Sequence, residues 1–566
     1  MIAAIFLAFL SSVVIYWQTG RVLPLFDYTY QIENAYRIAV GQVPYRDFIL
    51  ITTPLMHGLL ALFMRIFGFS SVAPLLYMIF TSFFVVLATY WVLVLLKINK
   101  RLHICFLLPL VFAAHGIVPL PSYDVTATLF VLLSLGWILR FIFLGPTNFL
   151  TSFIAGVLLV LPVLTKQNVG FSFMASAYLT LGSINWIKPQ IIRKRTILVI
   201  LAGSMAVGIL FGIILGLSHS LLPFIRQNRF VWENRDPLNY ASAILYDVVY
   251  WKNLLIYFPI ALAYFIVKPL HSKYWRTAII ASAVAFSISI IPAIFFFTIF
   301  RQTIYIDLSL KLQVAVRYFV SVWYLVLILT FAFVTKRLFN LRKFNKKEYM
   351  MAFTQVILGF ATMSALLAQG VGGSTFGIYP FFILLLASLY QICIHSYDRI
   401  SWDFVYKTAL ILTTIFLMVF AYFNIRQSYV PVIGIPNSFV TRSLWHLATP
   451  GLWTKEIDNM FLVVKKTIPY DQTVVALPGE DPFYFVTGRK PQLRYFELFS
   501  GALPYSPERI ANDIAINNID WLVIKTNLQS SYYMDTKPII KKLSSCFVLY
   551  RQIPSYSLYR RYHSCQ

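Results

Sequence analysis

The sequence has little charge for its length. Charged side chains make up 12% of the 566 residues, and hydrophobic side chains make up 59%. Soluble globular domains carry about 25% charged residues, so this chain has too little polar surface to face water on every side. Its mean hydropathy is +0.73. The composition excludes an ordinary soluble domain and predicts a protein whose main solvent is lipid.

Acidic residues are especially scarce. The chain has 21 Asp and Glu against 47 Lys and Arg, which gives a formal net charge of +26. Nucleic-acid-binding proteins can show such a balance. Here, however, most of the excess Lys and Arg lies in short gaps between apolar runs, as the positive-inside rule expects of a membrane protein. The distribution therefore favours a lipid bilayer as partner and argues against nucleic acid.

Cysteine is rare too. The chain has four Cys, and none forms a Cys-x-x-Cys or Cys/His spacing that is typical of zinc sites. Cys105 and Cys393 lie in or beside apolar runs. Cys546 and Cys565 lie in the polar tail, where two states are open: a disulfide if the tail is outside the cytoplasm, or free thiols. The cysteines therefore predict no metal centre.

Long apolar runs dominate what is present. A membrane-spanning helix needs about 20 apolar residues, and several runs reach that length. The first run, residues 1–17, lacks both the basic start and the clear cleavage site of a signal peptide. We therefore expect it to be retained as the first helix.

The polar gaps between these runs form two sets that alternate along the chain. One set is basic and comprises the gaps near residues 97–101, 140, 188–195, 268–276, 336–348 and 399. The other set carries Pro, Gly, Tyr and acidic residues and comprises the gaps at 19–72, 115–124, 166, 218–250, 301–316 and 369–379. If the first helix starts in the cytoplasm, the basic set lies inside and about 13 spans result. We therefore expect a polytopic α-helical protein of the plasma (inner) membrane, with residues 1–425 as its transmembrane domain.

The tail, residues 426–566, differs in composition from the rest. "TVVALP" and "IDWLVIKT" are short β-branched runs typical of buried strands. Between them, "SPERIANDIAINN" has the Ser-Pro start and early Glu that favour a helix N-terminus. "CFVLYRQIPSYSLYRR" alternates like a pair of strands. These patterns predict a small α/β domain, which the topology places on the extracytoplasmic face.

The first outer gap holds two amphipathic segments, at about 27–68. In "YQIENAYRIAV" the apolar residues recur at helical spacing: Ile32, Ala35, Tyr36, Ala39 and Val40. This spacing predicts a helix along the membrane surface, with Glu33 and Arg37 exposed as an i, i+4 pair and Gly41 as the cap at its end. The second segment is "TTPLMHGLLALFMRIFG". We expect both segments to lie near the lipid headgroups.

Three charged residues in consecutive outer gaps could meet in one cavity. Asp27 and Asp124 each stand at the expected start of a helix, so each could alternatively be an N-cap. Lys166, in "LTKQN", is a cation on the side where the positive-inside rule disfavours one. It could alternatively reach outward to lipid phosphate. A dedicated contact with a bound phosphate is the functional interpretation.

Other outer residues are weaker candidates. Arg301 and Arg317 bound an amphipathic segment that could close over a lipid or be an ordinary interfacial helix. Arg46 follows the first amphipathic helix and could help to hold a phosphate. In the tail, the aromatic residues around Arg489 could bind an acceptor, or could simply pack between a strand and a helix.

These elements resemble the GT-C glycosyltransferases that use polyprenyl-phosphate sugars, a superfamily that includes protein O-mannosyltransferases and lipid A aminoarabinose transferases. The resemblance lies in the order of a first helix, an outer-loop Asp27, the stretch "YRIAVGQVPYRDF", "PLMHGLLALFMRIFG", "SYDVTATLF" and "LTKQN". It covers motifs through about residue 190. Beyond that point it covers only the layout, with about 13 spans and an extracytoplasmic C-terminal domain.

The resemblance implies a chemistry for these residues. Asp27 would be the catalytic base, Asp124 would share or orient the reaction, and Lys166 would contact the lipid phosphate. The chain departs from the family where Tyr28, rather than an acid, follows Asp27. Glu33 is the next acid, and His57 stands near the position of a family Lys. The remaining substrate-binding candidates are Arg46 and Arg301.

The implied reaction is an inverting transfer of a sugar from a polyprenyl-phosphate donor to a hydroxyl on a glycan, lipid or protein acceptor. No cofactor is expected, although two carboxylates could hold one divalent ion. Two rival interpretations are open. One is a transporter or flippase, which would place ionisable residues near helix centres and show repeated halves. The other is a polymerase or ligase of envelope polysaccharides that uses the loop at 218–250.

Overall fold

The computed structural model describes most of the two ends of the chain and part of the middle. The described ranges are residues 1–20, 25–115, 119–145, 148–187, 189–233, 346–367, 379–395, 436–450, 453–495, 497–498, 506–528 and 533–564, with a few single positions between them. The spans predicted between 234 and 345 and between 396 and 425 lie outside these residues, and so does Arg301. The predicted number of spans therefore stays a prediction.

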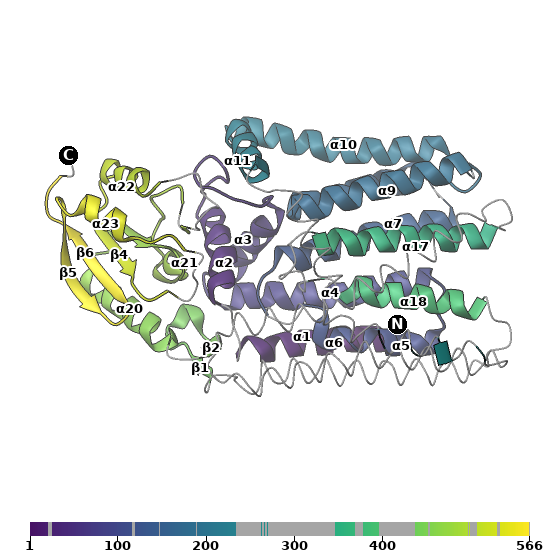
Figure 1. The fold of residues 1–566 in the computed structure, drawn as a ribbon, viewed down its shortest axis with the longest axis horizontal. Coiled ribbons are helices and arrows are strands. Elements are labelled where there is room, and N and C mark those ends of the chain that lie inside the picture. Colours follow the sequence, from purple (N-terminus) through teal and green to yellow (C-terminus); the bar gives the residue numbers. More distant parts are fainter. Residues whose placement is uncertain are drawn as a thin grey trace.

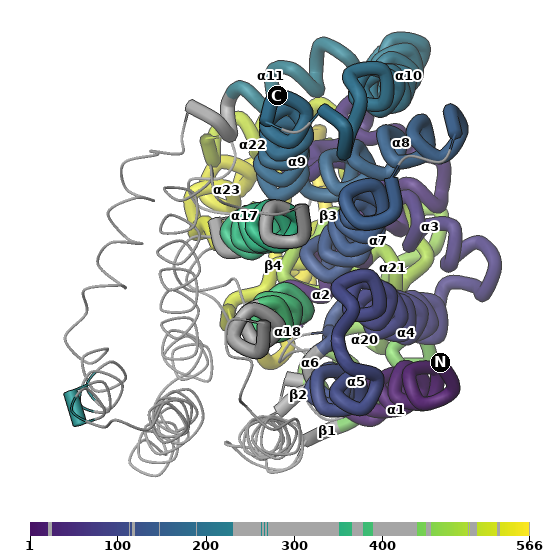
Figure 2. Tube along the Cα trace, turned by 90° about the vertical axis from the view of Figure 1, so that its right-hand side faces the viewer, coloured from purple at the N-terminus to yellow at the C-terminus, as the bar shows by residue number. Residues whose placement is uncertain are grey.

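Long helices form a bundle in the described part of the chain (Figure 1). They are α1 (Ile2–Thr19), α4 (Val72–Leu95), α7 (Tyr123–Leu144), α8 (Phe149–Thr165), α9 (Gln167–Ile187), α10 (Lys194–Leu217), α17 (Lys346–Leu367) and α18 (Tyr379–His395). Two short helices, α5 (Lys100–Leu107) and α6 (Leu110–Ala113), lie beside them. Seen from the end of the bundle (Figure 2), α7 is surrounded by α4, α8, α9 and α17. Among the described helices, α1, α4, α7 and α10 are long and apolar enough to cross a membrane.

The two predicted sets of gaps lie at opposite ends of this bundle (Figure 1). The gaps from the set with Pro, Gly, Tyr and acids precede α7, join α8 to α9 and join α10 to α11 (Leu221–Glu233), and they face the C-terminal domain. The basic gaps that join α4 to α5 and α9 to α10 lie at the far end. The predicted alternation is thus confirmed for these helices, and the compartment that each end faces stays a prediction.

Two outer helices separate the bundle from the C-terminal domain (Figure 1). They are α2 (Leu25–Ala39) and α3 (Leu55–Phe67), where the sequence predicts amphipathic segments. Gly41 ends α2 with φ +92°, and its amide donates to the Ile38 carbonyl, so the predicted cap is confirmed. The exposure expected for Glu33 and Arg37 is wrong: both are fully buried, because the C-terminal domain covers that face of α2.

The C-terminal domain is built on a four-stranded sheet of order β3–β4–β6–β5. Its strands are β3 (Val474–Leu477), β4 (Trp521–Lys525), β5 (Phe547–Ile553) and β6 (Tyr556–Arg561). β3 and β4 are parallel, and the other pairs are antiparallel. The helices are α20 (Trp453–Thr467), α21 (Phe483–Thr487), α22 (Pro507–Ile516) and α23 (Lys537–Leu543), and a small ribbon pairs β1 (Pro436–Ser438) with β2 (Ala448–Pro450).

Several local predictions for the tail are confirmed. The two β-branched runs are β3 and β4, and the alternating run is the antiparallel pair β5–β6. α22 begins as expected, because the Ser506 hydroxyl accepts a hydrogen bond from the Arg509 amide. Cys546 is in a disulfide, whereas Cys105 is free and buried. Cys565 lies outside the described residues.

The C-terminal domain docks onto α2 through polar contacts within a shared apolar core. Glu33 Oε1 accepts hydrogen bonds from the amides of Tyr484 (2.8 Å) and Phe485 (3.1 Å) at the start of α21. Arg37 donates to the Leu493 carbonyl at 2.8 Å. A single hydrophobic cluster joins α2 and α3 to α20, α21 and the sheet. The domain therefore packs directly against this end of the bundle.

Replacing Glu33 with Ala is expected to weaken this docking. The change removes two buried hydrogen bonds and leaves the amides of Tyr484 and Phe485 buried without an acceptor, which costs about 2–4 kcal/mol. Thermal unfolding in detergent and limited proteolysis of the C-terminal domain measure the effect. Asp471→Ala, a change at an exposed acid of the same domain, is the control. Equal stability of the two variants would contradict the docking role of Glu33.

Candidate active site

Asp124 and Lys166 form a buried ion pair at the domain-facing end of the bundle. Asp124 is the second residue of α7, and Lys166 lies at the junction of α8 and α9. Lys166 Nζ lies 2.5 Å from Asp124 Oδ1, and the exposed fractions of the two side chains are 7% and 8%. Because both side chains are buried, each charge needs the other as its partner: a single buried charge in this position would destabilise the fold.

Asp124 does not cap α7, so its carboxylate is available for the ion pair with Lys166. Ser122 is the N-cap, since its hydroxyl accepts a hydrogen bond from the Asp124 amide at 3.1 Å. The Thr126 hydroxyl donates to the Ser122 carbonyl at 2.8 Å. The alternative that Asp124 itself caps the helix is therefore wrong.

Local packing holds the Lys166 side chain inside the protein. The ammonium lies 4.7 Å from the centre of the Tyr123 ring, a cation–π contact. After Lys166, α9 turns back against α8 so closely that a Cβ on Gly170 would lie 2.1 Å from the Val163 nitrogen. The alternative that Lys166 reaches outward to lipid headgroups is wrong for this conformation, because its side chain turns inward to Asp124.

Asp27 lies in the first turn of α2, close enough to Asp124 for their charges to interact. Its carboxyl group is partly buried, and none of the described residues donates a hydrogen bond to it. Burial, together with the negative charge of Asp124, raises the pKa of Asp27 to about 6. A carboxylate with a pKa this close to neutral accepts a proton readily, which suits a general base.

Aromatic rings line this region. The ring of Tyr30 meets His57 edge to face at 5.9 Å and Tyr123 at 6.4 Å between centroids. His57 is fully buried, and neither of its ring nitrogens has a hydrogen-bond partner among the described residues. Burial lowers the pKa of His57 to about 3, so the imidazole is neutral. His57 thus adds polarity to the region without adding charge.

The structure does not bring every candidate together. Asp124 and Lys166 are in contact, Asp27 lies near enough to Asp124 to be affected by its charge, and the ring of Tyr30 contacts His57. Glu33 instead faces α21. Arg46 is exposed and forms an ion pair with Asp47 at 2.7 Å.

The C-terminal domain supplies an acid that the sequence did not reveal. Glu497 is only 5% exposed, and neither of its carboxylate oxygens has a hydrogen-bond partner within the described ranges. Burial, then the negative charge of Asp27, raises its pKa well above the ordinary value. The only local sign is an acid within the aromatic run "RYFELF". This local sequence does not predict which distant residue lies near Glu497.

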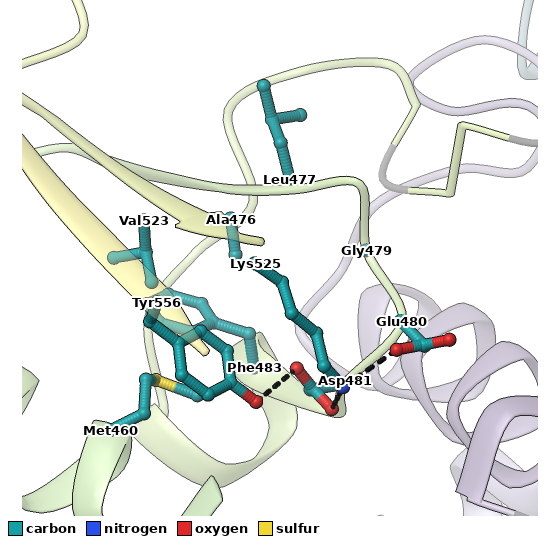
Figure 3. A pocket seen from close by; sticks show the side chains of 10 residues that line it. All are labelled: Met460, Ala476, Leu477, Gly479, Glu480, Asp481, Phe483, Val523, Lys525 and Tyr556. Carbon is teal, nitrogen blue, oxygen red and sulfur yellow. Dashed lines mark hydrogen bonds and ion pairs between the residues drawn. The ribbon is translucent and has the colours of Figure 1, made fainter. Parts of the chain in front are cut away.

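A second polar cluster lies at the carboxyl ends of β3 and β4 (Figure 3). Lys525 forms ion pairs with Glu480 at 2.7 Å and Asp481 at 2.8 Å, and the Tyr556 hydroxyl donates to Asp481 at 2.8 Å. All four side chains are buried. Because Lys525 connects the end of β4 to Glu480 and Asp481, we interpret the cluster as support for the loop that carries these two acids.

Arg489 also has a structural role. It is 7% exposed, and its guanidinium donates to the carbonyls of Ile468, Pro469 and Gln472 at 2.7–2.9 Å. The structure therefore supports a role for Arg489 in holding the C-terminal domain together, and not in binding an acceptor.

The described residues do not fit a divalent metal. No group of three His, Cys, Asp or Glu among them lies close enough to hold one ion. Asp124, one of the two carboxylates that could have shared an ion, is in contact with the Lys166 ammonium.

Comparison with known proteins gives a likeness of fold. No family model and no curated protein matches the sequence. Among solved structures, the chain is similar to the oligosaccharyltransferase AglB from Archaeoglobus fulgidus in complex with an inhibitory peptide and a dolichol-phosphate, with a TM-score of 0.50 and 11% identity over 99% of this chain and 74% of that one. The apo form of the Archaeoglobus fulgidus oligosaccharyltransferase gives a TM-score of 0.51 with 12% identity over the same shares of the two chains.

A second protein is similar at a lower score. ArnT from Cupriavidus metallidurans bound to undecaprenyl phosphate gives a TM-score of 0.44 and 10% identity over 98% of this chain and 97% of that one. The likeness to the oligosaccharyltransferase covers nearly the whole of this chain. This chain therefore has a fold similar to that of the archaeal oligosaccharyltransferase.

Proposed function

We propose that the protein is an integral membrane glycosyltransferase that moves a sugar from a polyprenyl phosphate to a hydroxyl acceptor. The observation that carries the proposal is the meeting of Asp27, Asp124 and Lys166 at one end of a GT-C helix bundle. A base and a buried cation are the two groups that this transfer needs.

Lys166 is the proposed contact for the phosphate of the donor. Its ammonium is buried and held by Asp124 and Tyr123, so it needs little reorganisation to stabilise charge on a leaving phosphate. The similar archaeal oligosaccharyltransferase has been solved with a dolichol-phosphate, which is a phosphate of this kind. The lipid tail would extend along the apolar helices.

Asp27 is the proposed base. The acceptor oxygen forms a bond to the anomeric carbon while the bond from that carbon to the phosphate oxygen breaks. The electron pair of the broken bond goes to the phosphate, and the hydroxyl proton goes to Asp27. Because the acceptor attacks from the face opposite the phosphate, the single displacement inverts the anomeric centre. No step requires a cofactor.

The site is proposed to face the extracytoplasmic side of the plasma (inner) membrane. The basic gaps of the bundle lie at the opposite end from the C-terminal domain, and the positive-inside rule assigns them to the cytoplasm. The disulfide at Cys546 agrees with this, since disulfides persist mainly in oxidising compartments. The acceptor is then a glycan, lipid or protein of the cell envelope.

The helix-end position of the charges favours an enzyme over a transporter. Transporters place their ion and substrate sites near the midplane of the bilayer. Here Asp27 and Asp124 stand in the first turns of α2 and α7, and Lys166 lies between two helices. All three are at the end of the bundle that faces the C-terminal domain.

A transfer assay with the full-length protein tests the proposed function. Purified protein in nanodiscs is incubated with radiolabelled polyprenyl-phosphate sugars and a membrane extract as the source of acceptors. We expect one labelled sugar to move to an acceptor, with free polyprenyl phosphate released in equal amount. Heat-inactivated protein is the control. Movement of an unchanged donor across the bilayer, with no product formed, would indicate a flippase instead.

A further inference from the structure

Glu497 is held in place by backbone hydrogen bonds on its C-terminal side. The amide of Leu498 donates to the Pro478 carbonyl at 2.9 Å, and the Leu498 carbonyl accepts from the Met534 amide at 2.7 Å. Four residues earlier, the Leu493 carbonyl accepts from Arg37 of α2 at 2.8 Å. A fixed backbone thus carries a buried carboxyl group that has no hydrogen-bond partner among the described residues.

The charges that face Glu497 are negative. They belong to Asp27, Glu33 and Glu480. Glu33 accepts backbone amides at α21, and Glu480 is in an ion pair with Lys525, so these two acids are already compensated. Asp27 and Glu497 remain as two neighbouring carboxyl groups without a donor in the described part of the chain. Buried groups of this kind normally have a partner, which here would be a ligand.

Glu497 and Lys166 adjoin different acids of the site. The charge of Asp124 affects Asp27, and the charge of Asp27 affects Glu497. Lys166 contacts Asp124, at the other end of this series. An acceptor that gives its proton to Asp27 would therefore lie near Glu497 as well, whereas a phosphate on Lys166 would lie near Asp124.

Aromatic side chains accompany the two acids. Tyr30 lies close enough to Glu497 for the negative charge of that acid to help raise the pKa of the phenol, and its ring contacts His57 and Tyr123. Sugars suit such a surface, because their hydroxyls donate to carboxylate oxygens and their C–H faces pack on aromatic rings.

We propose that Glu497 and Asp27 form the acceptor subsite and that the acceptor is a carbohydrate. One sugar hydroxyl donates to Asp27, which removes its proton, and a neighbouring hydroxyl of the same ring donates to Glu497. This inference rests on the proposed function. It also makes the active site incomplete without the C-terminal domain, which supplies Glu497.

Kinetics of Glu497→Gln in the full-length protein test the inference. The donor is the polyprenyl-phosphate sugar that the transfer assay identifies, and the acceptors are methyl hexosides and methyl pentosides, with a serine-containing peptide and ethanolamine as other classes. We expect the KM for the sugar acceptor to rise by about 10-fold, as for one lost hydrogen bond. The KM for the donor and the slow transfer of its sugar to water should stay unchanged.

Two further variants separate binding from folding. Glu497→Asp, which keeps a carboxyl group, should recover part of the lost acceptor affinity. Asp513→Asn is the control, since this acid of the same domain already accepts a hydrogen bond from the Tyr495 hydroxyl at 3.3 Å and should leave the acceptor KM unchanged. If Glu497→Gln unfolds the protein, methyl glycosides that protect wild-type Glu497 from carbodiimide labelling provide the same evidence.

Several results would overturn the inference. An unchanged acceptor KM in Glu497→Gln, or a rise in the donor KM instead, would remove Glu497 from the acceptor subsite while leaving the proposed function standing. Transfer to the peptide or ethanolamine but to no sugar would refute the carbohydrate class. By contrast, a wild-type protein that consumes no donor, either by transfer or by hydrolysis, would refute the proposed function itself and the inference with it.

Discussion

Replacing Asp27 with Asn is expected to reduce transfer by about 10²- to 10⁴-fold, the usual contribution of a positioned general base. Asparagine keeps nearly the same volume but cannot take the proton of the acceptor hydroxyl. Since none of the described residues donates a hydrogen bond to the carboxylate, the change should leave the fold intact. The measurement is kcat for sugar transfer, with the thermal unfolding temperature as a check on folding.

The same carboxyl group should set the acid side of the pH profile. Burial and the charge of Asp124 raise the pKa of Asp27 to about 6. Below that pH the group is protonated and cannot act as a base, so the rate should rise as pH increases through about 6 and then level off. In Asp27→Asn this rise should be absent.

Asp47→Asn is the matched control for Asp27. This acid also lies in the first outer gap, but its carboxylate is already in an ion pair with Arg46. We expect the control to keep both the rate and the pH profile of the wild type. Equal transfer by wild type and Asp27→Asn would remove Asp27 from the mechanism.

Replacing Lys166 with Met is expected to damage activity and stability together. Transfer should fall by about 10²- to 10³-fold, because the leaving phosphate loses a preorganised cation. The variant also leaves Asp124 buried beside Asp27 without its partner. Breaking a buried pair in this way costs about 3–5 kcal/mol. Transfer kinetics and thermal unfolding in detergent measure the two effects.

A double variant separates these two effects of Lys166. Adding Asp124→Asn to Lys166→Met removes the buried charge, so most of the lost stability should return. Transfer should stay low, because the cation is still missing. Recovery of transfer in the double variant would mean that Lys166 only neutralises Asp124 and does not act on the phosphate.

The sequence predicted the features that depend on near neighbours in the chain. Hydropathy and the alternation of polar gaps predicted the bundle and its two ends. Helical spacing predicted α2 and its glycine cap, and β-branched runs predicted β3 and β4. The meeting of Asp27, Asp124 and Lys166 could be foreseen because membrane sidedness places all three at the same end of the helices, and resemblance to the GT-C superfamily pointed to the same residues.

Only the tertiary structure decided what the C-terminal domain does to this site. Glu33 and Arg37 have the spacing of a surface pair, yet they are buried because a segment 451 residues further along docks on them. For the same reason no local sequence pattern could predict that Glu497 lies near Asp27. Helical and strand periodicities report which face of an element is apolar. Which distant surface covers a polar group is decided only when the domains pack together, and that packing brings the proposed base and the proposed acceptor contact into one site.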